Sequence, residues 1–475
     1  MGTLLIANAA LVVTMDDART ELTDCDILVR DGVIEAVGPG LAANEVDEMV
    51  DAAGCLVIPG LINSHNHVFG TLFRGAPHLH RATPQEWIEG VYRIVELRPL
   101  DSDSFRAAAL AHFGKSLLTG CTLIADHHWL YQQRGPRDFV DREVEAALAI
   151  GIRLHVSRGC ITRGGYVPEG LVEKTEDVLA HAQELIDRHH DPAPHSMLRV
   201  FLSPTGVHCD TEAVYRGMRE LAEAHPEVQL HSHLYPGYEP RANILKQLEG
   251  RSTLDYMEDL GWVGDDVVFY HFTSKDPRDV ERVARQGSWV SVCPAMDMRM
   301  SFAGPEGALP PIRELLDVSG RVAIGTSNQA MNEGTVLLHD MRVCWLSDRM
   351  RFSEPERWVT ARDVLWMATR GGALALGRDD LGSIAPGMGA DLAVFPIDGI
   401  EMACHFDPVP TLYGFTGHTR ATIVNGRVVV RDGRLVSVDQ DAVARDAHAA
   451  SRLFAPGISW PPERSWSIRP RDLSS

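Results

Sequence analysis

Eight short apolar segments, each followed by a helical pattern or a long excursion, constrain the fold of this chain most strongly. Their apolar residues are nearly continuous, as in strands of a parallel sheet that is covered on both faces. This alternation predicts an α/β fold with a closed, TIM-type (β/α)8 barrel. The predicted strands are residues 56–63, 121–126, 152–157, 198–202, 228–233, 267–272, 289–293 and 321–326. The predicted helices between them are residues 104–120, 138–150, 171–190, 211–225, 277–287 and 310–319.

The two ends of the chain predict a separate β-domain. "CDILVRDGVIEAVGPG" near the start and "ATIVNGRVVVRDGRLVSVD" near the end join short strands through Asp-Gly or Asn-Gly, the signal of tight hairpins. Because these hairpins are similar, we predict one small composite β-sandwich built from both termini; two independent β-caps are the alternative. The expected divisions are residues 1–58 for its first part, 59–383 for the barrel, and 384–475 for its second part with a C-terminal tail.

Charge, cysteines and hydropathy narrow the partners and the location. The formal net charge of −20 over 475 residues opposes nucleic acids and anionic membrane surfaces. The eight cysteines form no CxxC pair, so we expect buried, reduced thiols rather than a zinc–thiolate or redox site. No basic signal-peptide region and no long uninterrupted apolar run is present. We therefore expect a cytoplasmic protein, while the charge says nothing about a small substrate.

Histidines at the ends of predicted strands indicate a metal site. The chain has three His-x-His pairs, at 65/67, 78/80 and 231/233. Residues i and i+2 of a strand share a face, so His65 and His67 can bind one ion at the carboxyl end of the first barrel strand. His231, His233 and His271 end the fifth and sixth strands. Neutral imidazoles suit Zn²⁺ or Fe²⁺, and an open coordination position makes water a nucleophile near neutral pH. Buried structural histidines are the alternative, and we expect His78 and His80 on a surface loop.

Several other residues are candidates for binding a substrate. Trp87 in "QEWIEG" could stack on a planar ring, although core packing is equally consistent with its position. His128 (or its neighbour His127), His208 and Asn332 follow strands two, four and eight and could hydrogen-bond a heterocycle, or they could be structural. Cys293 ends strand seven, where a small buried apolar role is favoured.

The motifs "PGLINSHNH", "HSHLY", "YHFTS", "GTSN" and "GSIAPGMGADL" together resemble the amidohydrolase superfamily. They are most similar to the branch of guanine, 8-oxoguanine and S-adenosylhomocysteine deaminases and s-triazine hydrolases, and the similarity covers nearly the whole chain. The resemblance implies one divalent metal ion, Zn²⁺ or Fe²⁺, held by His65, His67, His233 and His271. It implies that His231 packs or hydrogen-bonds beside the site, and that the protein is a homodimer.

Two departures from that pattern concern proton transfer. Most of the superfamily ends strand eight with Gly-Thr-Asp or Gly-Ser-Asp, but this chain has Ser327, whose neutral hydroxyl is no base near pH 7. Some s-triazine hydrolases similarly carry a hydroxyl residue there. The branch also has Glu three residues after the strand-five ligand, where this chain has Pro236. Glu239 could serve instead through a three-residue insertion, or it is a solvated loop residue.

The resemblance implies a metal-dependent hydrolase that deaminates a small nitrogen heterocycle. Hydroxide attacks an electron-poor ring carbon, Ser327 hydrogen-bonds the hydroxide, His271 completes the site, and Glu239 protonates the departing amine. Displacement of chloride, an alkylamine or a thioether is the nearest variation. Because both usual carboxylates are missing or displaced, two alternatives stay open. One is altered chemistry on the same fold, such as ring opening or amide or C–C cleavage, and the other is a non-catalytic metal-binding relative.

Overall fold

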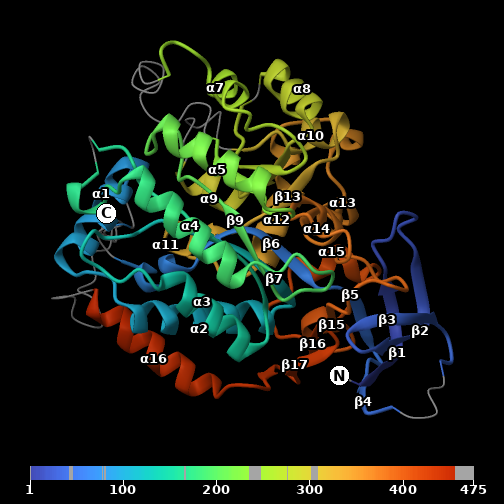
Figure 1. Ribbon diagram of the computed structural model, residues 1–475. Coiled ribbons are helices and arrows are strands. Elements are labelled where there is room, and N and C mark those ends of the chain that lie inside the picture. The colour runs from blue at the N-terminus through green and yellow to red at the C-terminus, as the bar shows by residue number, and fades with distance from the viewer. Residues whose placement is uncertain are drawn as a thin grey trace, which may run out of the picture.

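The computed structural model divides the strands of the chain between two sheets that lie beside each other (Figure 1). One sheet is entirely parallel and forms the barrel, and the other is a separate mixed sheet. Among the sequence-based candidates, Glu239, His78 and His80 lie outside the described residues. The structure describes residues 2–41, 46–76, 79, 82–164, 167–234, 248–274, 276–300 and 309–454.

The parallel sheet closes on itself, which confirms the predicted (β/α)8 barrel. Its strand order is β13-β12-β11-β10-β9-β8-β7-β6-β14. β14 follows β13 after Gly325-Thr326 and pairs with β6, so β13 and β14 are two halves of the eighth strand. The strands are β6 Leu61–His67, β7 Cys121–His128, β8 Arg153–Arg158, β9 Leu198–Leu202, β10 Leu230–His233, β11 Val267–Tyr270, β12 Trp289–Val292, β13 Val322–Ile324 and β14 Ser327–Asn328.

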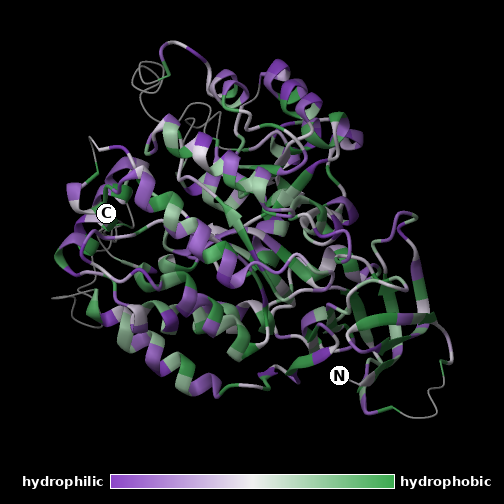
Figure 2. Ribbon diagram, in the orientation of Figure 1, coloured by the Kyte–Doolittle hydropathy of each residue, from purple (hydrophilic) through white to green (hydrophobic). Residues whose placement is uncertain are grey.

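Helices surround the barrel and carry hydrophilic residues on their outer sides, while the strands between them are hydrophobic (Figure 2). Each of the six predicted helices is present, with ends that differ by a few residues. The barrel helices are η1 Val68–Phe73, α1 Pro84–Leu97, α2 Ser102–Leu118, α3 Phe139–Ile150, α4 Thr175–His189, α5 Glu212–Ala224, α7 Thr253–Asp259, α8 Pro277–Gln286, α9 Pro294–Met300, α10 Ile312–Val318, α11 Gln329–Asn332, α12 Leu337–Ser347, α13 Ala361–Met367 and α14 Arg370–Ala375.

The prediction of one strand over residues 56–63 is wrong, because this segment contributes to both sheets. β5 (Cys55–Pro59) pairs with β15 in the mixed sheet, and the barrel strand β6 starts after Gly60. A side chain at position 60 would come within 2.1 Å of the Thr122 hydroxyl, so only glycine fits where the chain crosses. The apolar run is continuous because both halves are buried.

The mixed sheet contains strands from both ends of the chain, as the similar hairpins predict (Figure 1). Its order is β18-β17-β16-β15-β5-β1-β2-β3, with β4 paired to β1. Asp31-Gly32 and Asp432-Gly433 connect their hairpins with positive φ at both positions, the conformation that the Asp-Gly signal predicts. The remaining strands are β1 Thr3–Val13, β2 Glu21–Arg30, β3 Val33–Gly38, β4 Glu48–Asp51, β15 Leu392–Pro396, β16 Ala421–Val424, β17 Arg427–Arg431 and β18 Arg434–Leu435. The domain boundaries at 58 and 383 stay predictions.

After the mixed sheet the chain returns to the barrel. Helix α15 (Pro408–Leu412) precedes the last hairpin, and helix α16 (Gln440–Leu453) packs against α2 and η1. The Ser451 hydroxyl donates a hydrogen bond to the Leu72 carbonyl at 2.8 Å, and the ring of Phe454 lies 5.5 Å from that of Phe73. The C-terminal segment therefore supports the region that follows the first barrel strand.

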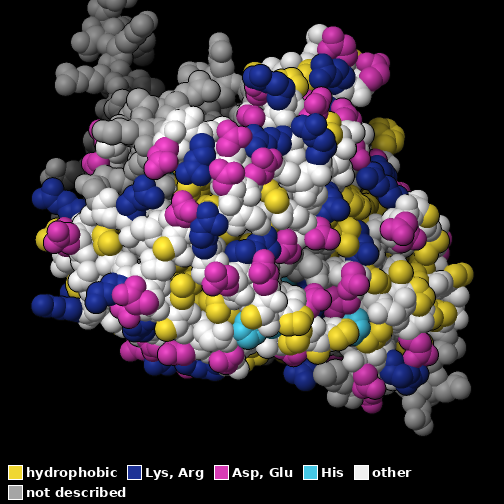
Figure 3. Space-filling model, turned by 45° about the horizontal axis from the view of Figure 1, so that its top comes forward, with side chains coloured by type: hydrophobic (Ala, Val, Ile, Leu, Met, Phe, Trp, Pro, Cys, Tyr) yellow, Lys and Arg dark blue, Asp and Glu magenta, His cyan; other side chains and the backbone are white. Residues whose placement is uncertain are grey.

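The described surface carries acidic and basic side chains interspersed over the face in Figure 3. No helix in the described part of the chain is long and apolar enough to cross a membrane. The cysteines form no disulfide among the described residues. Seven of the eight are buried as expected, but the expectation is wrong for Cys404, which is exposed on the loop before α15.

Candidate metal centre and active site

Four histidines meet at the carboxyl ends of β6, β10 and β11. The ring centroid of His65 lies 4.5 Å from that of His67, 4.9 Å from that of His233 and 5.2 Å from that of His271. All four rings are buried, with at most 5% of any residue exposed. One nitrogen each from His65, His67 and His233 lies within 4.8 Å of the others, close enough to share one ion. The structure thus brings the four predicted ligands together.

The second nitrogen of three of these rings is held by a hydrogen bond. Nδ1 of His67 donates to the His127 carbonyl at 2.7 Å, and Nδ1 of His233 donates to the Thr205 carbonyl at 2.7 Å. Because a carbonyl only accepts, Nδ1 carries the proton and Nε2 keeps its lone pair. Nδ1 of His271 lies 2.8 Å from the Asp297 carboxylate. Such partners orient metal-binding imidazoles and increase their basicity.

Burial keeps the imidazoles of His65, His67 and His233 neutral. It is the largest cause that lowers the pKa of His65 and His233 well below the usual range and that of His67 to about 3, and the neighbouring rings lower them further. Neither ring nitrogen of His65 has a hydrogen-bond partner among the described residues. A buried, unpartnered imidazole among other neutral imidazoles is costly unless it binds something. The residues therefore fit a divalent metal ion, which would take the four lone pairs.

Ser327 lies beside this cluster at the interruption of the eighth strand. Its hydroxyl oxygen is 3.2 Å from Nε2 of His271. Ser327 and His271 have φ of 54° and 59°, a conformation that non-glycine residues adopt rarely and that concentrates at functional sites. Gly325 allows the close approach, because a Cβ there would lie 2.7 Å from Cβ of His65. The chain thus places a neutral hydroxyl next to the histidine cluster.

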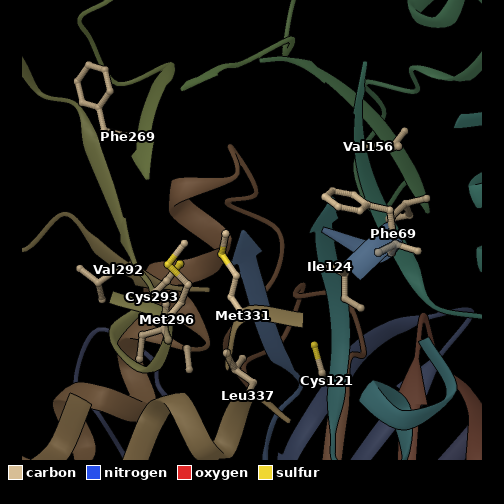
Figure 4. Packing of buried hydrophobic residues seen from close by; sticks show 14 of the residues in the cluster. Phe69, Cys121, Ile124, Val156, Phe269, Val292, Cys293, Met296, Met331 and Leu337 are labelled. Atoms are coloured by element: carbon tan, nitrogen blue, oxygen red, sulfur yellow. The ribbon is translucent and has the colours of Figure 1, made fainter. Parts of the chain in front are cut away.

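A largely apolar pocket opens above the histidines. Its empty space is about 550 Å³, which includes open solvent at its mouth. No Asp, Glu, Lys or Arg is among the described residues that line it. Met296 and Met331 belong to the surrounding core, together with Cys293 and Phe69 (Figure 4). The lining residues are His67, Trp87, Ile88, Val91, Tyr92, Trp129, Thr205, His208, His233, Met296, Ser327, Asn328 and Met331.

Two of the four predicted substrate-binding residues lie in this lining. Trp87 is on α1, which starts with a capping box between Thr83 and Glu86, and its Nε1 donates to the Ala330 carbonyl at 3.2 Å. His208 follows β9, and burial lowers its pKa to about 4, so it is a neutral hydrogen-bonding group. Their contact with a substrate stays a prediction.

The structure does not support a direct substrate contact for the other two, because neither is in the pocket lining. His128 is fully buried, and its ring lies 4.6 Å from that of Phe105 and 4.7 Å from that of Phe139. The Asn332 amide donates to the Thr326 carbonyl at 2.8 Å and its oxygen accepts from Gly334. Both arrangements fit the structural alternative.

Several residues of the site were missed from the sequence. Asp297 on helix α9 and Thr205 in the loop after β9 contact the rings of His271 and His233 from distant parts of the sequence, and no local spacing indicates these contacts. Trp129 and Asn328 directly follow residues that were considered, and only the strand geometry turns them toward the pocket. Tyr92 could have been found, because it follows Trp87, Ile88 and Val91 at helical spacing on one face of α1.

Comparison with known proteins decides the family. The sequence profile of the "Amidohydrolase family" matches residues 56–429. The chain belongs to this family. Hydroxydechloroatrazine ethylaminohydrolase of Pseudomonas sp. (strain ADP) is 33% identical over 95% of this chain and 96% of its own length. The 8-oxoguanine deaminase of Pseudomonas aeruginosa is 30% identical over 90% of this chain and 95% of its own length.

Solved structures agree with these relatives. The atrazine chlorohydrolase from Arthrobacter aurescens TC1 complexed with zinc is 34% identical, with a TM-score of 0.89 over 94% of this chain and 100% of that chain. A triazine hydrolase from the same genus has a TM-score of 0.90 at 34% identity, over 95% of this chain and 100% of that chain. The predicted branch and the predicted class of enzyme, a hydrolase, are confirmed.

Proposed function

We propose that this amidohydrolase uses one Zn²⁺ to hydrolyse a small, uncharged, planar nitrogen heterocycle that carries an apolar substituent. The observation that supports it is the meeting of four buried imidazoles below a pocket without a charged residue in its described lining. Zinc, when bound, supplies a Lewis acid that makes water a nucleophile near neutral pH. A homodimer and a cytoplasmic location stay predictions.

The residues of the chain have separate roles in this proposal. His65, His67, His233 and His271 hold the ion, with three rings oriented by the His127 and Thr205 carbonyls and the Asp297 carboxylate. The Ser327 hydroxyl hydrogen-bonds the attacking water but cannot take its proton. Trp87, Tyr92 and Trp129 provide aromatic surface for a planar ring.

Glu239 is proposed as the group that takes the proton of the attacking water and delivers it to the departing amine. His208 is a poor alternative, because burial lowers its pKa to about 4 and keeps it neutral at pH 7. Replacing Glu239 with Gln should abolish turnover while the zinc content stays at one ion per chain. Full activity of that variant would remove Glu239 from the mechanism.

The pocket favours an alkylamino-substituted triazine among the substrates that relatives' names indicate. Ile88, Val91, Met296 and Met331 offer apolar surface for an alkyl group. A substrate with a carboxylate or a phosphate would need a cationic partner that the described lining does not provide. An oxopurine is the second candidate, since Thr205, His208 and Asn328 could hydrogen-bond its polar edge.

A substrate panel tests the proposal on the purified zinc enzyme. The panel holds an alkylamino-s-triazine, a chloro-s-triazine, 8-oxoguanine, isoxanthopterin and 5′-deoxyadenosine, with chromatographic detection of the released amine, chloride or ammonia. We expect the highest kcat/KM for release of an alkylamine from the triazine. Fastest turnover of 8-oxoguanine would support the second candidate. Silence across the panel with zinc bound would overturn both and favour altered chemistry.

A further inference from the structure

His65 differs from the other three proposed ligands in how its ring is held. The rings of His67, His233 and His271 are each anchored through Nδ1 by a carbonyl or a carboxylate. Neither nitrogen of His65 has such a partner among the described residues. The torsion that rotates an imidazole ring about its Cβ–Cγ bond has broad minima, so a ligand ring needs an external constraint to present one nitrogen accurately.

Among the described residues, the shortest ring contact of His65 is an aromatic stack with Tyr270. The Tyr270 ring lies against the His65 ring with centroids 3.6 Å apart and planes inclined by 22°. Tyr270 ends β11, directly before His271, and both stacked residues are fully buried. A ring packed face to face resists rotation of its neighbour, because rotation would drive ring edges into the stacked face.

Tyr270 is itself held by the other histidine of the strand-five pair. The Tyr270 hydroxyl oxygen lies 2.6 Å from Nδ1 of His231. The His231 ring stacks in turn on Phe201, with centroids 4.1 Å apart and an interplanar angle of 24°. His231 lies two residues before His233 on β10. It is fully buried and is not among the described residues that line the pocket. The contacts therefore run from Phe201 through His231 and Tyr270 to His65.

We propose that Tyr270 is a positioning residue that orients His65 for metal binding through its ring face, and that His231 holds Tyr270 in place. This inference rests on the proposed metal site. It gives His231 a role other than ligation: the first histidine of "HSH" anchors a tyrosine while the second binds the ion. It also explains how the His65 ring is held although neither of its nitrogens has a hydrogen-bond partner among the described residues.

Two variants at position 270 separate the ring from the hydroxyl. Tyr270→Phe keeps the stack and leaves Nδ1 of His231 without a partner, so we expect a lower melting temperature with zinc affinity within about 3-fold of wild type. Tyr270→Met fills similar space without a planar face. We expect its zinc affinity to fall about 10–100-fold, as for the loss of other groups that orient metal ligands.

The measurements are zinc affinity by chelator competition, the visible spectrum of the Co²⁺-substituted protein, and thermal unfolding of the metal-free protein. The Co²⁺ spectrum reports ligand geometry, and a merely structural role would leave it unchanged. We expect altered bands for Tyr270→Met and wild-type bands for Tyr270→Phe. Wild-type affinity and bands in Tyr270→Met, or equal losses of affinity in both variants, would overturn the inference.

A second test leaves Tyr270 in place and changes its support. His231→Leu should lower zinc affinity by less than Tyr270→Met does. In the Tyr270→Phe background, where the hydrogen bond between Tyr270 and His231 is already absent, His231→Leu should cause no further loss of zinc affinity. An additive loss there would contradict the proposed order of contacts. If the wild-type protein binds no zinc, the proposed function fails together with this inference. If it binds zinc and turns over substrate while Tyr270→Met is unaffected, only this inference fails.

Discussion

The two ends of the barrel bury polar groups in opposite ways. At the carboxyl ends of the strands, His65 keeps two ring nitrogens without a partner in the described structure. At the opposite end, Arg153 begins β8 and is equally buried, yet its guanidinium donates to the Asp391 carboxylate at 2.8 and 3.0 Å. It also donates to the carbonyls of His195 and Ser196 and to the side chain of Asn425.

This difference distinguishes a site that can bind a ligand from a structural contact between the barrel and the mixed sheet. Arg153 connects the barrel to residues of the mixed-sheet segment, and it is satisfied by the chain alone. In the proposed metal site, an added ion and not the protein would complete the bonding of His65. Residues at the carboxyl end of a TIM-type barrel serve function, while those at the other end serve stability. Substitutions at the two ends should therefore affect different measurements.

The largest effect should come from His67→Ala. Removing one ligand leaves three imidazoles and a gap in the proposed site. Loss of a group that orients a ligand can lower metal affinity roughly 100-fold, and we expect the loss of a ligand itself to lower zinc affinity further. Turnover should become undetectable. Bound zinc at 1,000 times its Kd adds about 4 kcal/mol to the free energy of unfolding. A chelator should thus lower the melting temperature of the wild type and leave that of His67→Ala unchanged.

His128→Leu is the control for this prediction. His128 is as buried as His67 and ends the neighbouring strand, but it lies among Phe105, Tyr131 and Phe139 outside the pocket lining. We expect this variant to retain one zinc per chain. Loss of zinc from His128→Leu with retention in His67→Ala would reverse the assignment of the two histidines.

Arg153→Met tests the opposite end of the barrel. It leaves the Asp391 carboxylate buried without its ion pair, which typically costs about 3–5 kcal/mol of stability. Urea unfolding should show this loss, while zinc content and kcat of the folded protein stay near wild type. The double variant Arg153→Met/Asp391→Leu should recover much of the stability, because no buried charge remains unpaired. A selective loss of zinc in Arg153→Met would contradict the separation of the two ends.

Near the carboxyl end of β7, a buried acid pair predicts a pH effect. The Asp126 carboxylate accepts hydrogen bonds from the Asn66 side chain at 2.6 Å and the Val68 amide at 2.7 Å, beside the ligand strand. It faces the carboxyl group of Glu143, and both groups are fully buried. Burial raises the pKa of Asp126 to about 7, and burial together with Asp126 raises that of Glu143 well above its usual range.

The sign of the effect follows from proton binding. The unfolded chain loses these protons near pH 4, whereas the native pair retains them at higher pH, so the free energy of unfolding falls as pH rises from 5 to 7. Each retained proton contributes about 1.4 kcal/mol per pH unit. Glu143→Gln removes one titrating carboxyl group and keeps a hydrogen-bond donor, the amide, toward Asp126. The free energy of unfolding of this variant should therefore depend less on pH. Glu145→Gln, on the exposed side of the same helix, is the control, and an equal flattening there would rule out the pair as the cause.

Local patterns explain which parts of this site could be predicted from the sequence. The spacing of His65 and His67 and the position of His271 after an apolar run depend only on strand periodicity, and the structure brings these residues together. The barrel follows from the repeated alternation of strand and helix patterns. The crossing at Gly60 was missed because a buried strand has the same composition in either sheet, so hydropathy contains no sign of the change.

The supporting groups depend on tertiary packing and have no local signal. Asp297 reaches His271 from the helix after β12, and Thr205 reaches His233 through its carbonyl, which carries no side-chain identity. Tyr270 appears in the sequence as one more apolar residue of a strand. His128 and Asn332 were chosen because they follow strands, but side chains at strand ends alternate between the pocket and the surrounding helices.

The smallest effect should come from Trp87→Phe. Both side chains are aromatic, but the smaller ring loses part of the surface that faces the pocket and the bond from Nε1 to the Ala330 carbonyl. Aromatic stacking contributes about 0.5–1.5 kcal/mol, so we expect KM to rise about 2–10-fold with kcat nearly unchanged. Trp358→Phe is the matched control, because Trp358 donates a similar bond to the Phe352 carbonyl at 2.9 Å and does not line the pocket. If both variants raise KM equally, the effect reflects the lost hydrogen bond and weaker packing around the ring. Trp87 then does not contact the substrate.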